Sequence, residues 1–136
     1  DSEEPIPPAR IAQVLGCSHS YLRKVLGMLS KAGLLKSHRG PQGGVLLALP
    51  PKQITMLAVV EACQGLLLGT YCKAIGDATG PVCAYHQAMW DIRRATRDAM
   101  ARWTLADMIA APLPTGPLSG NDQCKMNFMR EFDLTK

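Results

Sequence analysis

The chain has 136 residues, of which 47% are hydrophobic and 19% are charged. This composition excludes a disordered chain, and the length fits one soluble globular domain. The longest apolar stretch, residues 54–68, is interrupted by Glu61 and Gln64, which excludes a membrane span there. No basic and apolar signal-peptide pattern opens the sequence, so a cytoplasmic location is expected.

Positive charge is concentrated in one third of the chain. Residues 5–50 contain six basic side chains and no acidic one (net +6), whereas residues 51–136 contain nine basic and eight acidic ones (net +1). A positive field confined to one segment favours a polyanionic partner such as DNA. The six basic residues are Arg10, Arg23, Lys24, Lys31, Lys36 and Arg39.

Two short helices are predicted near the beginning of the sequence. Pro7 and Pro8 suit the entrance of a helix that runs to about Leu15 and stops at Gly16. Ser18 is a good N-cap for a second helix, in which apolar residues recur every three or four residues. This helix is expected to end near residue 33. The tight link between the two helices is typical of a helix-turn-helix.

A β-hairpin is predicted next. Short apolar runs at residues 34–37 and 45–48 flank a glycine-rich stretch, as in the wing of a winged helix. Thr55 is then expected to cap a further helix that is buried and ends near Cys63. Several glycines and prolines in residues 65–81 favour a loop.

A long helix is predicted for residues 84–102, with one apolar stripe that must be buried against another surface. A second copy of the chain is the simplest candidate for that surface, because two-fold homodimers are the commonest oligomers. The segment from Thr104 to Asp107 resembles a capping box and starts a short helix to about Ala111, and residues 112–136 are expected to form a flexible tail. The stripe consists of Tyr85, Met89, Ile92, Ala95, Ala99 and Trp103.

Six short motifs occur in order along these elements. They are Ile11–Gly16, Ser18–Leu22, Leu29–Leu34, Arg39–Gly44, Pro51–Thr55 and the segment from Cys83 to Trp90. Over residues 8–111 the chain resembles the Rrf-type family of winged helix-turn-helix transcriptional regulators, of the IscR and NsrR kind. The resemblance implies a mainly α fold with a two-stranded wing and a long C-terminal dimerisation helix. It also implies a homodimer that binds a double-stranded DNA operator and has no enzymatic activity.

The resemblance also implies an organisation into segments. Residues 5–63 form the winged helix-turn-helix domain, 64–83 a sensor loop that binds a cluster, 84–111 the dimerisation helix with a short terminal helix, and 112–136 the tail. The family pattern begins with a further helix, for which this sequence has no counterpart ahead of Pro5. Gln42 is a second departure, because the wing of the family usually has a glycine there.

DNA contacts are assigned from the charge pattern and the resemblance together. Side chains at the start of a recognition helix reach base edges, while lysines and backbone amides nearer the rim neutralise phosphates. Arg23 is expected to form a bidentate hydrogen bond with the edge of a guanine. Gln42 is expected to contact DNA through its side-chain amide. The alternative is that Arg23 and Lys24 belong to a solvated helix face. The expected DNA-binding residues are His19, Ser20, Tyr21, Arg23, Lys24, Arg39 and Gln42.

A ligand set for a metal centre is implied by the same resemblance. Cluster-binding relatives have three loop cysteines and a variable fourth ligand. Cys83 matches the third cysteine, and His86 matches a histidine of some relatives. Asp77 stands where the second cysteine is expected, and Cys72 lies one residue closer to Cys83 than the usual first cysteine does. These donors favour a 2Fe-2S cluster over a 4Fe-4S cluster, because imidazole can replace thiolate on one iron. The same donors can hold zinc.

Other interpretations remain open at this point. The chain can be a clusterless regulator that senses through thiols, zinc or a small molecule, rather than a cluster sensor of redox state, iron or nitric oxide. It can also be a metal-binding protein-interaction module without DNA binding, or Cys83 and His86 can be an inert buried thiol and a satisfied polar residue. Cys17 and Cys63 are expected to be structural, and Cys124 lies in the tail. Catalysis is not expected, because no orienting group or oxyanion hole accompanies Cys83 and His86.

Overall fold

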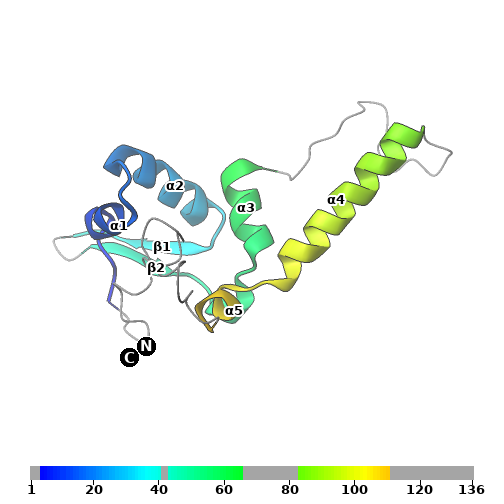
Figure 1. The fold of residues 1–136 in the computed structure, drawn as a ribbon. Helices are drawn as coiled ribbons and strands as arrows, with labels where there is room; N and C mark the ends of the chain where they lie inside the picture. Colours follow the sequence, from blue (N-terminus) through cyan, green and yellow to red (C-terminus); the bar gives the residue numbers. More distant parts are fainter. Residues whose placement is uncertain (1–3, 41–42, 66–82, 111–136) are drawn as a thin grey trace, which may run out of the picture.

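The computed structural model of the chain describes residues 4–40, 43–65 and 83–110. In Figure 1 the first two helices and a hairpin form one unit, a third helix lies beside them, and a long helix extends away. This arrangement confirms the predicted winged helix-turn-helix with its two-stranded wing and a long helix after it. The elements are α1 (Pro8–Leu15), α2 (His19–Lys31), β1 (Leu35–His38), β2 (Gly44–Leu47), the 3-10 turn η1 (Pro51–Gln53), α3 (Met56–Gln64), α4 (Ala84–Arg102) and α5 (Leu105–Ala110).

The turn between α1 and α2 forms as the local sequence dictates. Gly16 adopts a φ of 60°, which an L side chain tolerates poorly, and this residue ends α1. The Cys17 N–H donates to the Ala12 carbonyl over 3.1 Å. Ser18 then caps α2, because its Oγ accepts from the Tyr21 N–H over 3.2 Å. Leu22, on the inner face of α2, is buried.

The wing is an antiparallel pair in which Leu35 lies opposite Leu47 and His38 lies opposite Gly44. Both strands start and end within one residue of the predicted runs. A third segment joins the sheet, since Ile6 and Val45 exchange two backbone hydrogen bonds of 3.0 Å. A Cβ atom added at Gly44 would lie 2.5 Å from the Ile6 carbonyl oxygen, so this glycine permits the close approach.

The segment after the wing is joined to the end of α4. Ile54 is only 1% exposed, and its carbonyl accepts from the Leu105 N–H over 2.9 Å. The Met56 N–H donates to the Trp103 carbonyl over 2.8 Å, and Thr55 forms an isolated bridge with Thr104. These contacts fix the end of α4 against the start of α3.

Two side-chain caps stabilise the helices at this junction. Thr55 Oγ1 accepts from the Ala58 N–H over 3.1 Å at the start of α3. Asp107 accepts from both the hydroxyl and the N–H of Thr104, and Thr104 Oγ1 accepts from the Asp107 N–H. These Thr104 hydrogen bonds hold the pKa of Asp107 below its ordinary value. The predicted capping box is therefore confirmed.

The long helix α4 spans the predicted residues 84–102, and the single chain leaves large apolar side chains of its predicted stripe exposed. Tyr85 and Ile92 are 62% and 51% exposed in the single chain. Trp103 lies one residue past the helix end and does not continue the stripe within α4. Within the part of the chain that the structure describes, no helix has the length and hydropathy that a membrane crossing requires.

We predict that Gly44→Ala destabilises the fold by about 1–3 kcal/mol, because the new methyl group overlaps the Ile6 backbone. Gly27→Ala is the matched control: Gly27 lies in α2 with open space around its Cα, so alanine is expected to stabilise the helix by about 0.5–1 kcal/mol. Urea unfolding followed by circular dichroism measures both effects. A Gly44→Ala variant as stable as the wild type would contradict the close approach.

Candidate nucleic-acid interface and candidate cluster ligands

The side chains predicted to contact DNA are exposed on the first half of α2 and on the wing. Tyr21 is 64% exposed although it is large and aromatic, which places its ring on the surface beside the basic residues. Gln42 lies outside the described residues. The exposed members of the predicted set are His19, Ser20, Tyr21, Arg23, Lys24 and Arg39.

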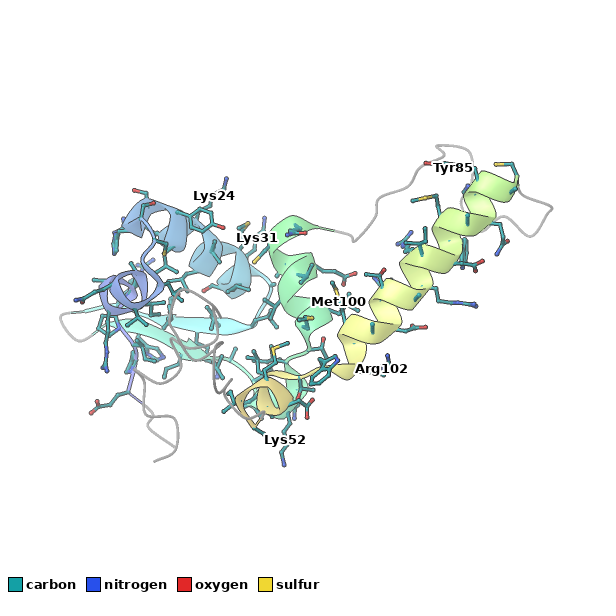
Figure 2. All side chains as sticks on the ribbon, viewed as in Figure 1. Lys24, Lys31, Lys52, Tyr85, Met100 and Arg102 are labelled. Carbon is teal, nitrogen blue, oxygen red and sulfur yellow. The ribbon has the colours of Figure 1, made fainter. Side chains whose placement is uncertain are left out.

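The basic side chains of α2 lie in two different surroundings. Figure 2 shows Lys24 and Lys31 projecting from α2 away from the β1–β2 sheet. Arg23 is among the residues that line a groove between α2 and the wing. Between these two elements the Oγ atoms of Ser30 in α2 and Ser37 in β1 lie 3.2 Å apart in a hydrogen bond. The helix therefore presents one basic face outward and has one basic residue beside the groove.

A groove of about 350 Å³ lies between α2 and the wing. Pro8, Leu26 and Val45 are among the residues that line it, together with Arg23, Ser37 and His38. None of the described residues that line it is acidic. The groove is therefore mainly apolar, and Arg23 is the one arginine or lysine among the described residues that line it.

A chain of contacts joins this interface to α4. The helix α3 packs against both α2 and α4. Glu61 in α3 and Arg97 in α4 form an ion pair in which both side chains are partly exposed. Contrary to the expectation of a buried helix, no residue of α3 is fully buried, and Cys63 near its end is half-buried.

The structure brings two of the predicted cluster ligands to one end of α4. Cys83 is the N-cap residue of α4 and is exposed, so it is not the buried small hydrophobe of the inert interpretation. His86 follows in the first turn, where its Nδ1 atom is buried and has no hydrogen-bond partner among the described residues. Cys72 and Asp77 lie outside the described residues. Within residues 4–40, 43–65 and 83–110, no three His, Cys, Asp or Glu side chains gather in a metal-binding group.

Sequence reasoning did not find the groove or the Glu61–Arg97 pair. The two charged residues are 36 positions apart, so no helical or strand periodicity relates them. The groove depends on the position of the wing relative to α2, which a local pattern does not specify. The sequence predicts Arg23 as a DNA-contacting residue but does not predict that it lines this groove.

Comparisons with known proteins place the chain in a family. The family model Rrf2, described as iron-dependent transcriptional regulator, matches residues 1–111. The HTH-type transcriptional regulator IscR of Vibrio cholerae is 32% identical over 108 residues, which cover 79% of this chain and 62% of that protein. IscR of Erwinia tasmaniensis is 34% identical over 108 residues, covering 79% of this chain and 66% of that protein. The chain thus spans about three fifths of the length of the Vibrio cholerae relative.

Solved structures agree with this placement. CymR, the global cysteine regulator of B. subtilis, is 28% identical with a TM-score of 0.63, and the match covers 79% of both chains. T. potens IscR is 26% identical with a TM-score of 0.62, covering 87% of this chain and 81% of the other.

The protein is therefore a winged-helix protein of a transcription-regulator class. It belongs to the Rrf2 family, whose members are DNA-binding transcriptional regulators and not enzymes. The predicted family, fold class and non-enzymatic nature are confirmed.

Proposed function

We propose that this chain regulates transcription as a homodimer that binds double-stranded DNA through α2 and the wing. The observation that carries the proposal is the exposed basic surface on α2 beside the wing, in a segment that has no acidic residue. In this arrangement α2 enters the major groove and the wing lies against the flanking backbone or minor groove. His19, Ser20 and Tyr21 at the start of α2 are positioned to read base edges, and Lys24 and Arg39 to neutralise phosphates.

We predict that the double reversal Lys24→Glu and Arg39→Glu abolishes binding to duplexes selected by this chain from a random library. Wild-type affinity should fall linearly with salt on logarithmic axes, with a slope of about −0.9 per neutralised phosphate. Arg94→Glu with Arg102→Glu, two exposed positions on α4, is the charge-matched control and should retain binding. Salt-independent affinity, or equal loss in the control, would instead favour a protein-interaction module.

We propose that the exposed face of α4 is the dimer interface. Ile92, with 51% exposure, and Tyr85, with 62%, are large apolar side chains on one side of this helix, and such contiguous patches mark protein contacts. A two-fold related α4 covers the same stripe on both copies. The interface would therefore place both α2 helices on one face of the dimer, as successive major grooves require.

Ile92→Glu is expected to convert the dimer into a monomer, because it places two like charges in an apolar contact. Ala101→Glu is the control, since Ala101 is exposed and lies on the opposite side of α4 from Ile92. Light scattering coupled to size-exclusion chromatography gives the mass of each variant. The interface assignment fails if Ile92→Glu remains dimeric or if the wild type is already a monomer.

We propose that Cys83 and His86 bind a metal centre, with Cys72 and Asp77 as the further ligands. The exposed Cys83 thiol and the buried His86 Nδ1, which has no hydrogen-bond partner among the described residues, support this assignment, because burial normally requires such a partner. Two thiolates with nitrogen and oxygen donors suit a 2Fe-2S cluster better than a 4Fe-4S cluster. Such a cluster, when bound, supplies one-electron redox chemistry and sensitivity to iron supply or nitric oxide.

A second candidate is a regulator of the same family that senses through thiols, zinc or a small molecule. The likeness to CymR, named as a cysteine regulator, favours this alternative. The two candidates share the DNA interface and the dimer, and they differ only in what occupies the end of α4 where Cys83 and His86 lie. Metal analysis of purified protein therefore separates them.

Cys83→Ser should remove iron, acid-labile sulfide and visible absorption from anaerobically purified protein while leaving thermal unfolding unchanged, because Cys83 is exposed and packs little. Cys17→Ser, in the helix-turn-helix turn, is the control and should keep all three. Iron content at the wild-type level in Cys83→Ser would exclude Cys83 as a ligand. A wild type that stays colourless after reconstitution would favour the zinc, thiol or small-molecule regulator.

A further inference from the structure

We propose that α4 can close onto α3, and that Arg93 of α4 then binds the carboxylate of Glu61 in α3 beside Arg97. Among the described residues Glu61 pairs with Arg97 alone, so the structure shows the open arrangement. This inference rests on the proposed function and deepens it, because it names the contact by which the position of α4 is passed on to α3.

Arg93 shares a face of α4 with Arg97. Residues four positions apart on a helix are neighbours on its surface, and Arg97 is the residue of α4 that pairs with Glu61 across the contact with α3. Arg93 and Arg97 are both half-buried, whereas Arg94 between them is exposed. Arg93 therefore lies on the side of α4 that faces α3, one helical turn, or about 6 Å, from Arg97.

Arg93 has no acidic partner within the described part of the chain. No ion pair or hydrogen bond of its side chain occurs there, whereas Arg94 lies 3.9 Å from Asp91 on the same helix. The like charges of Arg93 and Arg97 also repel each other, which destabilises a helix unless a carboxylate lies between them. The residues three and four positions from Arg93 on α4 are Met89, Trp90, Thr96 and Arg97, none of which is acidic.

Glu61 is the acidic residue available to this face of α4. Residues 4–40 and 43–65 contain only two acidic residues, Glu4 and Glu61, and Glu61 is the only one in α3. Arg97 binds Oε1 of the Glu61 carboxylate. Oε2 has no hydrogen-bond partner among the described residues, and a carboxylate accepts hydrogen bonds at both oxygens. Glu61 can therefore accept a second arginine without releasing the first.

The anchored end of α4 gives the closing motion a direction. The Met56 N–H donates to the Trp103 carbonyl and fixes this end against the start of α3, and Figure 1 shows the two helices diverging from there. Arg97 and Arg93 precede Trp103 by six and ten residues, or about 9 and 15 Å along the helix axis. A swing of α4 toward α3 therefore moves Arg93 farther than Arg97 and brings it toward Oε2 of Glu61.

Closure connects the far end of α4 with the DNA-binding unit. Cys83 precedes Trp103 by twenty residues, about 30 Å along the axis, so it moves farther than either arginine. Because α3 packs against α2, a change at Cys83 that favours closure also favours one position of α2 relative to α4. Arg93 is thus a positioning residue for the switch, and it does not touch the metal centre or the DNA.

The first experiment measures backbone hydrogen exchange in the first half of α4 by mass spectrometry, on the whole chain without DNA. Arg93→Gln should speed this exchange by about 1.5- to 5-fold, the effect expected of one partly exposed ion pair. In a Glu61→Gln background the same substitution should have no further effect, because Arg93 then has no contact left to lose. Arg93→Lys keeps the charge and should retain most of the protection.

Arg94→Gln is the matched control, because it removes an exposed arginine next to Arg93 on the same helix. Any effect of this substitution on hydrogen exchange should be the same with Glu61 and with Gln at that position. Thermal unfolding verifies that each variant is folded.

The second experiment connects the contact with regulation. The affinity for a selected duplex is measured on anaerobic protein with its iron and after iron removal. Arg93→Gln should change the ratio of the two affinities by about 1.5- to 5-fold, because it destabilises only one of the two α4 arrangements. Arg94→Gln should leave the ratio at the wild-type value.

Additive effects of Glu61→Gln and Arg93→Gln on hydrogen exchange would overturn the inference, because they would show that Arg93 does not bind Glu61. A wild-type affinity ratio in Arg93→Gln would overturn its regulatory part. Non-additive exchange in a protein whose wild-type affinity does not depend on iron would instead refute the proposed iron sensor and support the contact between Arg93 and Glu61.

Discussion

Two backbone hydrogen bonds determine how the long helix is placed relative to the DNA-binding unit. The Leu105 N–H donates to the carbonyl of Ile54, whose side chain is fully buried, and the Met56 N–H donates to the Trp103 carbonyl. A buried carbonyl such as that of Ile54 costs free energy if it loses its partner, so this contact resists separation. The end of α4 therefore moves together with the start of α3, and α3 packs against α2.

This attachment makes α4 a rigid connection between a sensor and the DNA interface in the proposed function. Cys83 and His86 lie at the far end of α4 from Trp103, and Figure 1 shows α3 and α4 diverging toward that end. The Glu61–Arg97 ion pair links the two helices between these extremes. A change of ligands at Cys83 and His86 can then favour one of two α4 arrangements in the dimer, and the spacing of the two α2 helices changes with it.

Much of the fold was predictable because its determinants are local. Ser18, Thr55 and Thr104 each cap the helix that follows them, and the glycine-rich stretch places the hairpin to within one residue. The Ile6–Val45 bridge and the groove between α2 and the wing were not predictable, since each depends on segments that meet only in the folded chain. The candidate DNA surface is predicted from charge, and the roles of its residues remain predictions, as do those of Cys72, Asp77 and Gln42.

In the proposed function, the state of the Cys83 and His86 site controls DNA binding by α2 and the wing. The most direct test measures the affinity of one anaerobic preparation for one selected duplex, before and after its iron and sulfide are removed by chelation. The account predicts an affinity change of about 5- to 150-fold, the usual range of allosteric coupling, that reverses on reconstitution. Equal affinity in both states, with the loss of iron and sulfide verified, would contradict it.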